Sequence, residues 1–362
     1  MKQFFKELWW DLTRYYRRRF ITIIVCAVLF LASFLTFHFL TADLYDQQGA
    51  ARWSEEGDYA QLSCYYPVQE EHDEYDFVSL HHTLENELKL ASLEETEQAR
   101  LFVDACSVLG EVTITTSHGS STVNTYGVSD DFFLFHPVEL LTGSYFDDEM
   151  LMGDGVILDE RTAFELFGSY NVEGMTVDIN GTSSYVRAVV RQEQGHFYEA
   201  AGLEKSYCFI PFATFLKLAQ KTGGYTYEAI MPNQVEGFAK GIFEKVVSDE
   251  NKSREIIENS SRFQSKHLKQ VLYDFGVRSM SRKGIIYPYW ENVARAMEDI
   301  CSFLWITEVI TGCVAVLLMI LFIYKEWKKR KPSKKAVSRF FERIRDRGLE
   351  RIRKRKQKDS LD

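Results

Sequence analysis

A run of acidic and histidine side chains is the first group in this sequence that could bind a metal ion. It comprises Glu70, Glu71, His72, Asp73, Glu74 and Asp76, with His81 and His82 close behind. Carboxylate oxygens and imidazole nitrogens are ligands of divalent cations in proteins. Runs of this kind are more often solvated loops, and we favour that interpretation. We therefore predict no metal site and no bound cofactor.

Motifs that mark common catalytic sites are missing from the sequence. There is no G-x-x-x-x-G-K-[ST] phosphate loop, no H-E-x-x-H zinc motif and no C-x-x-C pair. Because the phosphate loop is a signature of nucleotide-binding sites, any ATP hydrolysis has to come from another chain. No set of serine, histidine and aspartate can be assigned as a catalytic triad from spacing. We predict that the protein is not an enzyme.

The cysteines do not form an obvious disulfide framework. Three of the six lie in or beside two long apolar runs: Cys26, Cys301 and Cys313. The other three lie between the runs: Cys64, Cys106 and Cys208. An odd number in one compartment argues against a framework of paired bridges. A bridge between Cys64 and Cys106 stays an open alternative.

Charge divides the chain into three zones. Residues 1–20 carry six basic and two acidic side chains, and residues 325–362 carry 17 basic and 6 acidic ones. These zones have net charges of +4 and +11, which leaves −24 for residues 21–324 of a chain whose total is −9. A chain that is basic at both ends and acidic between them indicates two compartments.

The two apolar runs separate these zones. Residues 21–40 include no formally charged side chain, and residues 300–324 include one acid, Glu308. At about 1.5 Å per residue, a helix of this length spans a bilayer core of about 30 Å. The flanking basic residues place both termini in the cytoplasm and residues 41–298 outside the cell membrane. We predict transmembrane helices at 21–40 and 299–324.

Other interpretations of the apolar runs are weaker. The first run could be a cleavable signal peptide, but it is long, and Leu40-Thr41-Ala42 is a poor cleavage site. The second could be a buried helix of a soluble protein, but its length and the basic block after it argue against this. Glu308 is a candidate helix contact within the membrane, because acids there are often functional. We favour a position of Glu308 near the membrane interface.

Both cytoplasmic segments combine basic with apolar residues. Apolar side chains on one face of residues 1–20 predict an amphipathic helix, either in the membrane interface or on a partner protein. The tail, 325–362, repeats this pattern at Val337, Phe340, Phe341 and Ile344. We expect lipid or partner contacts from these basic residues: Arg17, Arg18, Arg19, Lys328, Lys329, Arg330 and Lys331. A nucleic-acid-binding tail is a minor alternative, and we predict no nucleic-acid partner.

The outer segment mixes helix and strand patterns. Residues 82–106 look helical, with a break near Ala91-Ser92, while residues on either side of 118–121 alternate as strands do. A second pair of strands flanks Asn180-Gly181, the strongest short hairpin signal. The predicted fold class is α+β.

Three further segments carry helix start and stop signals. Residues 155–168 predict a strand and then a helix, with Asp159 as N-cap and Gly168 at its end. Residues 206–224 predict a strand, Pro211, a helix and a glycine stop. Pro288 predicts that one long helix begins near Tyr289 and enters the second span. Residues 41–56 predict an outward extension of the first span, which would make a two-helix stalk.

The order of elements over residues 126–216 supplies a family resemblance. The stretches that carry it are VSDDFF at 128–133, GSYF at 143–146, VIL at 156–158, LFG at 166–168 and YCFIPF at 207–212. They resemble the extracytoplasmic core domain of MacB-type ABC transporter permeases, a group that includes FtsX- and LolC-like proteins. The matching family positions are Asp130, Phe132, Gly143, Phe146, Leu166, Phe167, Gly168, Gly174 and Pro211. Val172 stands where the family usually has proline, and we interpret the matching residues as fold-specifying.

This resemblance implies a role in transport. Family permeases have four spans, one before the outer domain and three after it, whereas this sequence shows two apolar spans. It thus resembles the first half of such a permease. The resemblance implies that this chain works with a partner ABC ATPase and with either a further permease subunit or other copies of itself in a homo-oligomer. Its outer domain would couple these partners to extracytoplasmic substrate handling or signalling.

Two other readings stay open. The chain could be a stand-alone anchored receptor or scaffold, and its −24 zone would favour cationic partners. It could also be a truncated gene product.

Overall fold

The computed structural model describes residues 2–93, 100–146, 154–203, 205–219, 222–248, 253–278 and 284–330, together with 342 and 345. The chain divides into two compact units. One, which we call the helical unit, comprises Met1–Phe34 and Ile306–Asp362. The other, which we call the outer domain, is Leu35–Trp305.

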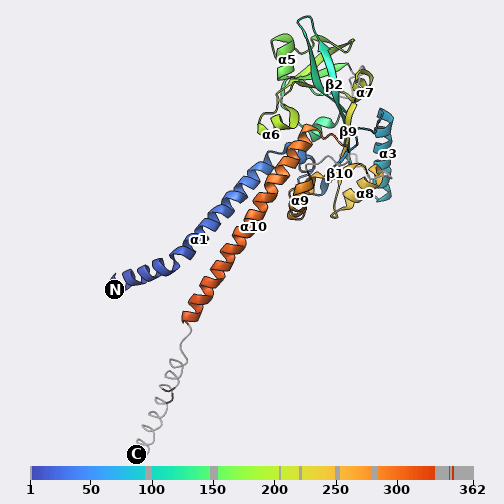
Figure 1. The fold of residues 1–362 in the computed structure, drawn as a ribbon. Helices are drawn as coiled ribbons and strands as arrows, with labels where there is room; N and C mark the ends of the chain where they lie inside the picture. The colour runs from blue at the N-terminus through green and yellow to red at the C-terminus, as the bar shows by residue number, and fades with distance from the viewer. Residues whose placement is uncertain are drawn as a thin grey trace, which may run out of the picture. The chain divides into compact units, whose positions relative to one another are not determined.

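The helices and strands follow one another in a mixed order (Figure 1). The helical segments are α1 (Lys2–Ala42), η1 (Tyr45–Gln47), α2 (Gly49–Trp53), α3 (Glu74–Leu90), α4 (Phe132–Phe135), α5 (Glu160–Phe167), α6 (His196–Tyr198), η2 (Glu199–Leu203), α7 (Phe212–Leu218), α8 (Phe238–Val247), η3 (Asn259–Ser261), α9 (Ser265–Arg278) and α10 (Tyr289–Arg330). The strands are β1 (Tyr59–Tyr65), β2 (Val103–Thr115), β3 (Ser120–Val128), β4 (Leu140–Gly143), β5 (Gly155–Asp159), β6 (Thr176–Ile179), β7 (Thr182–Val190), β8 (Tyr207–Pro211), β9 (Thr222–Pro232) and β10 (Glu255–Glu258).

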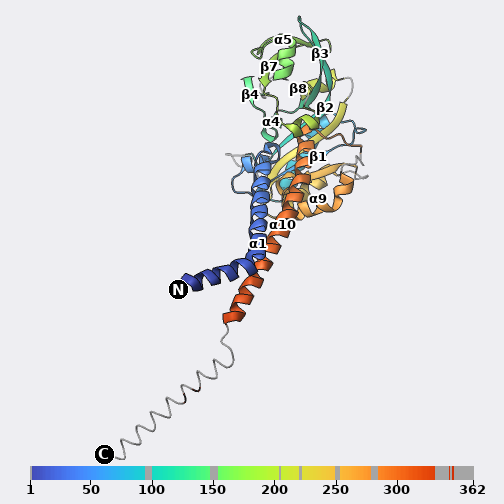
Figure 2. The same ribbon diagram turned by 60° about the vertical axis from the view of Figure 1, so that its left-hand side comes forward.

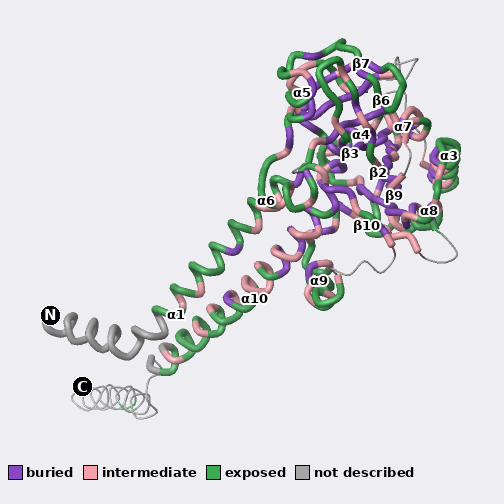
Figure 3. Tube along the Cα trace, turned by 45° about the horizontal axis from the view of Figure 1, so that its top comes forward, coloured by how far each residue is buried: buried purple, intermediate pink, exposed green. Residues whose placement is uncertain are grey.

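Helices α1 and α10 each contain a segment long and apolar enough to cross a membrane. These segments are Ile21–Ala42 and Tyr289–Lys325, and each has a mean hydropathy of 2.5. Along Ile21–Ala42 and residues 306–325, most apolar residues are exposed in the structure (Figure 3), as expected for surfaces that face lipid. Within the helical unit the Phe30 ring lies against Gly312, so the two helices meet where one has no side chain. The two predicted apolar helices are confirmed.

The two helices meet the outer segment differently from one another. Helix α10 begins at Tyr289, directly after Pro288, as predicted. The predicted extension of the first span through residues 41–56 is wrong, because α1 ends at Ala42 and only η1 and the short α2 follow. The side-chain amide of Gln48 donates to the carbonyl oxygens of Thr41 (2.8 Å) and Ala42 (3.2 Å). These two carbonyl oxygens would have accepted hydrogen bonds from backbone N–H groups if the helix had continued, and the Gln48 amide takes their place.

A ten-stranded sheet forms the centre of the outer domain. Its order is β10-β1-β9-β2-β3-β8-β5-β7-β4, and β6 pairs with both β2 and β7. This extra pairing closes β2, β3, β8, β5, β7 and β6 into a ring, while β9, β1 and β10 extend from β2 as an open sheet (Figure 2). The pairs β3–β8 and β5–β7 are parallel, and the other strand pairs are antiparallel. This mixed sheet with attached helices confirms the predicted α+β class.

Both predicted hairpins are present. Strands β2 and β3 pair across the turn at residues 116–119. Strands β6 and β7 pair across Asn180-Gly181, whose φ angles are 49° and 88°. Two successive positive φ angles are what a tight hairpin turn of the type I′ class requires, and asparagine and glycine adopt them most readily. The predicted caps of α5 are also present: the Asp159 side chain accepts from Thr162 N, and Gly168 ends the helix in the left-handed conformation.

Two sequence-based predictions for this domain are wrong. The predicted break near Ala91-Ser92 is present, because α3 ends at Leu90 and Ser92 has a φ of 63°. The helix predicted beyond the break, up to residue 106, is wrong, because Val103–Thr115 is strand β2. The glycine stop predicted after the helix at 212–218 is absent, because Gly223 and Gly224 lie in β9. A Cβ atom at Gly224 would lie 2.6 Å from the carbonyl oxygen of Ile286, so glycine is needed there for close approach.

Apolar residues cover both faces of the sheet. One face packs against α3, α5, α7 and α8, with Phe77, Leu166, Phe215 and Phe243 in the shared core. The opposite face packs against α2, α4, η2 and the start of α10, where Trp290 is fully buried. The first turn of α10 is therefore part of the outer domain's core.

Candidate functional site

The first four turns of α10 present a charged face to the sheet. Glu291, Arg295, Glu298 and Asp299 recur at a spacing of three to four residues, which places them on one side of the helix. Strand β1 faces them with alternate polar side chains, Gln61, Ser63 and Tyr65, while its other side joins the apolar core. A strand alternates in this way because successive side chains point to opposite faces.

Arg262 is the centre of this contact. It follows η3, and its side chain is 1% exposed. Its Nε donates to Glu298 Oε1 (2.6 Å), and its Nη2 donates to both oxygens of Glu291 (2.6 and 2.8 Å). Its Nη1 donates to Gln47 Oε1 (2.8 Å). The planar guanidinium thus joins two carboxylates of α10 to η1 and η3 through its fork of donors.

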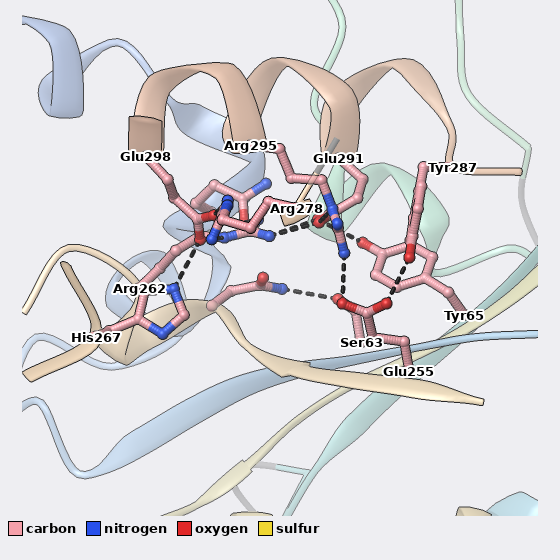
Figure 4. A network of polar contacts seen from close by, with 12 residues as sticks. Ser63, Tyr65, Glu255, Arg262, His267, Arg278, Tyr287, Glu291, Arg295 and Glu298 are labelled. Carbon is pink, nitrogen blue, oxygen red and sulfur yellow. Dashed lines mark hydrogen bonds and ion pairs between the residues drawn. The ribbon is translucent and has the colours of Figure 1, made fainter. Parts of the chain in front are cut away.

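A second cation, Arg295, ties the same helix to the edge of the sheet (Figure 4). Its Nε donates to Glu291 Oε1 (2.7 Å), and its Nη2 donates to Glu255 Oε1 on β10 (2.6 Å). The guanidinium lies 3.9 Å from the ring centroid of Tyr287, whose hydroxyl donates to Glu255 Oε2 (2.5 Å). The hydroxyl of Tyr65 on β1 donates to Glu291 Oε2 (3.0 Å).

Glu298 connects the network to α9. His267 Nε2 lies 3.0 Å from Glu298 Oε1, and Arg278 donates to Glu298 Oε2. Arg278 also pairs with Asp299 (3.2 Å). We use the name Arg262 network for these residues together: Gln47, Tyr65, Glu255, Arg262, His267, Arg278, Tyr287, Glu291, Arg295, Glu298 and Asp299.

The network keeps its members charged although burial opposes the charge. Burial lowers the pKa of the Arg262 guanidinium, but Glu291 and Glu298 outweigh it, so the pKa lies above the ordinary value. Burial raises the pKa of the Glu298 carboxyl, but Arg262 and Arg278 bring it well below its usual range. Ion pairs that are this deeply buried tolerate the loss of one partner poorly, because the other charge is then left without compensation.

A second polar group, which we call the His136 cluster, lies beside the start of α10. His136 is fully buried, and its Nδ1 lies 2.9 Å from Asp46 Oδ1 and its Nε2 lies 2.5 Å from Glu228 Oε2. Glu228 also accepts from Ser63 on β1 (2.5 Å). The imidazole ring packs against the ring of Trp290 at a tilt of 34°, with 4.1 Å between centroids. Burial lowers the pKa of His136, but the two carboxylates outweigh it and raise the pKa to about 9.

This geometry favours a structural role over acid–base catalysis. We use the word joint for the contact that the Arg262 network and the His136 cluster make between α10 and the rest of the outer domain. Both ring nitrogens of His136 are engaged by carboxylates, and the side chain is closed to solvent. A general base needs a free nitrogen within reach of a substrate proton. The charged residues instead connect α10 to β1, β9, β10, η1, η3 and α9. We therefore assign the Arg262 network and the His136 cluster as the candidate functional site.

Comparison with known families agrees with the fold. The model of the MacB-like periplasmic core domain matches residues 24–239, which is more than half of the chain. The chain belongs to this family. It is therefore related to the periplasmic domains of ABC transporter permeases.

Two solved structures are similar to this chain. The periplasmic region of MacB from Actinobacillus actinomycetemcomitans is 16% identical, over 59% of this chain and 92% of that chain, with a TM-score of 0.41. The extracellular domain of the noncanonic ABC-type transporter YknZ from Gram-positive bacteria is 15% identical, over 55% of this chain and 99% of that chain, with a TM-score of 0.37. No curated protein matches the chain.

The family-motif residues of the MacB-like domain lie around the ring of strands. Phe132, Phe146 and Leu166 are buried, Phe167 is half-buried and Asp130 is exposed. Gly143, Gly168 and Gly174 have φ angles of 79°, 71° and 77°. Pro211 ends β8 and precedes α7. Val172, at the position where the family usually has proline, is buried and donates its backbone N–H to Tyr170 O (3.1 Å).

Gly143 should tolerate substitution much less well than Gly168. A Cβ at Gly143 would clash with the carbonyl oxygen of Arg187 on β7, whereas a Cβ at Gly168 meets nothing nearby. We expect Gly143→Ala to cost about 2–5 kcal/mol from strain plus overpacking, and Gly168→Ala about 1–2 kcal/mol from the left-handed conformation alone. Thermal unfolding of the two purified variants measures this, and equal shifts would contradict it.

The other predicted site residues lie outside this joint. Glu308 belongs to the helical unit, where it is half-buried and its shielded carboxylate oxygen has no hydrogen-bond partner among the described residues. Lys328 is exposed near the end of α10. Five other basic residues lie in α1 or α10, but their side chains are outside the described part: Arg17, Arg18, Arg19, Lys329 and Arg330. Lys331 and the tail helix face at 337–344 lie outside the described residues.

The acidic run at 70–76 has local structural roles. Asp73 caps α3 by accepting from Asp76 N, and the Asp76 side chain accepts from Asp73 N in return. Glu70 pairs with Arg254 (3.0 Å). The first two contacts form a capping box at the start of α3, and the third is an ion pair between the segment before α3 and the segment before β10.

The open alternative of a Cys64–Cys106 bridge is wrong, because all six cysteines are free. Cys64 on β1 and Cys106 on β2 both pair with Tyr227 of β9, so one strand lies between them. Two strand spacings amount to about 10 Å, which is beyond the Cα separation of a disulfide. We expect reducing agents to leave the outer domain's stability unchanged for this reason.

Arg262, Glu291, Glu298 and His136 were not singled out from the sequence. The spacing of the charges at 291, 295, 298 and 299, directly before an apolar span, was a usable signal. It indicates one charged helix face that has to meet a partner outside the membrane. Their partners come from segments up to about 250 residues away along the chain, since Glu298 and Gln47 are joined through Arg262.

Proposed function

We propose that this protein is a membrane-integrated subunit of an ABC-permease type assembly, in which α10 and the outer domain move together. The observation that carries the proposal is the Arg262 network. Glu291, Arg295 and Glu298 of α10 bind groups from β1, β10, η3 and α9. The same helix continues to Arg330 and contains the second apolar segment.

The energetics of the joint support this coupling. Sliding α10 along the sheet would separate Arg262 from Glu291 and Glu298, and it would leave buried charges unpaired. Losing one partner of such a pair costs about 3–5 kcal/mol. Small displacements of α10 are therefore expected to carry β1 and β10 with them. Because a packed interface of this kind has discrete arrangements, motion would pass through it as a rigid-body movement.

The driving energy would come from a partner. The sequence has no phosphate loop, and the family resemblance implies an ABC ATPase with a further permease subunit or a second copy of this chain. The boundaries of the proposed segments are 1–20 (interfacial helix), 21–40 and 299–324 (spans), 41–298 (outer domain) and 325–362 (basic tail). Both termini would lie in the cytoplasm, where the basic tail contacts lipid or the ATPase.

The test is to identify what co-purifies with the protein. We would tag the full-length chain, extract it from its native host in mild detergent and identify bound proteins by mass spectrometry. The control is an unrelated two-span membrane protein with the same tag. We expect an ATPase with a phosphate loop, together with a multi-span permease or a second copy of this chain.

A preparation without any ATPase would contradict the proposal and favour a stand-alone anchored receptor. If the ATPase is present, deletion of 325–362 tests the tail: its removal should reduce the amount of bound ATPase while the outer domain's unfolding temperature stays unchanged. An ATPase that remains fully bound would assign the contact to another segment.

A further inference from the structure

Helix α3 carries three metal-ligating side chains on one turn, away from the Arg262 network. His81, His82 and Glu85 each offer one ligand atom, and these atoms lie within 4.8 Å of one another. The acidic run before them has its own structural partners, so it does not complete the group. We infer that His81, His82 and Glu85 form a zinc site, with Asp104 as the residue that orients His81.

The ligand set suits zinc. Two imidazole nitrogens and one carboxylate are the donor set of many zinc sites that keep a fourth position open for water or a ligand. Zinc–ligand bonds of about 2.0–2.1 Å place tetrahedral ligand atoms about 3.3 Å apart. The three side chains are 44%, 66% and 35% exposed. They can therefore close the remaining gap by rotamer changes at the surface, without repacking the core.

Asp104 distinguishes this group from a chance surface cluster. Its Oδ1 lies 2.8 Å from His81 Nδ1, and its Oδ2 accepts from the Tyr227 hydroxyl (2.7 Å). Tyr227 is buried on β9, so the carboxylate is held by the sheet rather than by α3. A carboxylate on Nδ1 fixes the tautomer in which Nε2 is free to bind a metal, and this arrangement is typical of zinc-bound histidine.

The remaining contacts leave room for the ion. Glu85 Oε1 is held by Lys89 (2.6 Å), while its Oε2 lies 3.7 Å from His82 Nδ1. Zinc would take Oε2 and leave the pair with Lys89 intact. The His81 ring packs beside Phe102, with 5.0 Å between centroids, which limits its rotation. The alternative is an ion pair between His81 and Asp104 with no metal.

The experiment is a zinc titration of the untagged full-length protein in detergent, after treatment with a chelator. Binding of Zn²⁺ alone is measured by competition with a chromophoric chelator, and Co²⁺ is used as a spectroscopic substitute. We expect saturable binding of one ion per chain. His81→Ala and Glu85→Gln should each weaken the affinity by about tenfold or more, and Asp104→Asn by about tenfold.

The matched control is His118→Ala, because His118 lies exposed in the turn between β2 and β3. It should bind zinc as the unchanged protein does. His81 and Glu85 are surface side chains, so circular dichroism should show both variants folded. Absence of saturable binding, or an affinity that does not change in His81→Ala and Glu85→Gln, would overturn the inference. An unchanged affinity in Asp104→Asn would remove the orienting role from Asp104.

Discussion

Arg262→Ala is expected to lower the free energy of unfolding of the outer domain by about 3–5 kcal/mol. The side chain is 1% exposed and is bound to Glu291 and Glu298, both of which are buried. Alanine removes the cation and leaves these carboxylates with less compensation in a site that water does not reach. Arg295 remains beside Glu291, and His267 and Arg278 remain beside Glu298, so the loss should stay within this range.

Thermal and urea unfolding of the full-length protein, followed by tryptophan fluorescence, measures this effect. Trp290 is fully buried in the first turn of α10 and therefore reports on this region. Arg191→Ala is the matched control, because Arg191 forms an exposed ion pair with Glu139 (3.3 Å). It should cost less than about 1 kcal/mol. Similar losses in the two variants would mean that the Arg262 network does not hold α10 to the sheet.

A triple variant tests whether the cost of losing Arg262 comes from the unpaired carboxylates or from the lost packing of its side chain. Arg262→Met combined with Glu291→Gln and Glu298→Gln removes the cation and both of its buried partners. We expect it to be more stable than Arg262→Ala, because neutral side chains cost less to bury than unpaired charges. If it is less stable, the network contributes net stabilisation that hydrophobic packing does not replace.

The second large effect is a pH-dependent contribution from His136. Its pKa is about 9 in the folded protein, against about 6.5 in an unfolded chain. The folded state therefore binds this proton more tightly than the unfolded state does. The stabilisation is fully present below about pH 6.5 and is lost as the pH rises towards 9. A shift of this size corresponds to about 3 kcal/mol.

The measurement compares the unchanged protein with His136→Gln across this pH range. Glutamine cannot carry the charge that faces Asp46 on η1 and Glu228 on β9, and it also loses the ring contact with Trp290. The lost ring contact adds a difference that does not depend on pH. The difference in unfolding free energy should therefore shrink by about 3 kcal/mol between pH 6 and 9.

His118→Gln is the control for the His136 experiment, because His118 is exposed in a turn. The free energy of unfolding of His118→Gln should equal that of the unchanged protein at every pH. A difference between the unchanged protein and His136→Gln that stays constant from pH 6 to 9 would show that His136 is neutral in the folded state.

The two effects have a common consequence for the proposed coupling. The Arg262 network and the His136 cluster both bind the first turns of α10, and both reach the same face of β1, since Tyr65 contacts Glu291 and Ser63 contacts Glu228. If the assembly is isolated with its ATPase, Arg262→Ala should leave the bound ATPase in place but weaken the response of the outer domain to nucleotide. The zinc site on α3 is a separate question, because none of its residues belongs to this joint.

The sequence by itself determined the features that depend on neighbouring residues. The length and apolarity of the two apolar helices, the Asn180-Gly181 turn, the caps of α5 and the start of α10 after Pro288 are all local. Each follows from backbone preferences or from the cost of exposing apolar surface, so composition and spacing predict it. The family motif at Leu166-Phe167-Gly168 is local in the same sense.

Only the tertiary structure decided where the buried charges meet. The strand at Val103–Thr115 forms because β9 and β3 pair with it, although its first residues continue a helical pattern in the sequence. In the sequence, Gly223 and Gly224 resemble a helix stop. In the structure they allow the close approach of Leu109 and Ile286, respectively. Arg262, Glu291 and His136 are ordinary charged residues in the sequence. Their burial, and therefore their importance, depends on partners brought together by folding, because a buried charge is tolerated only where its counter-charges converge.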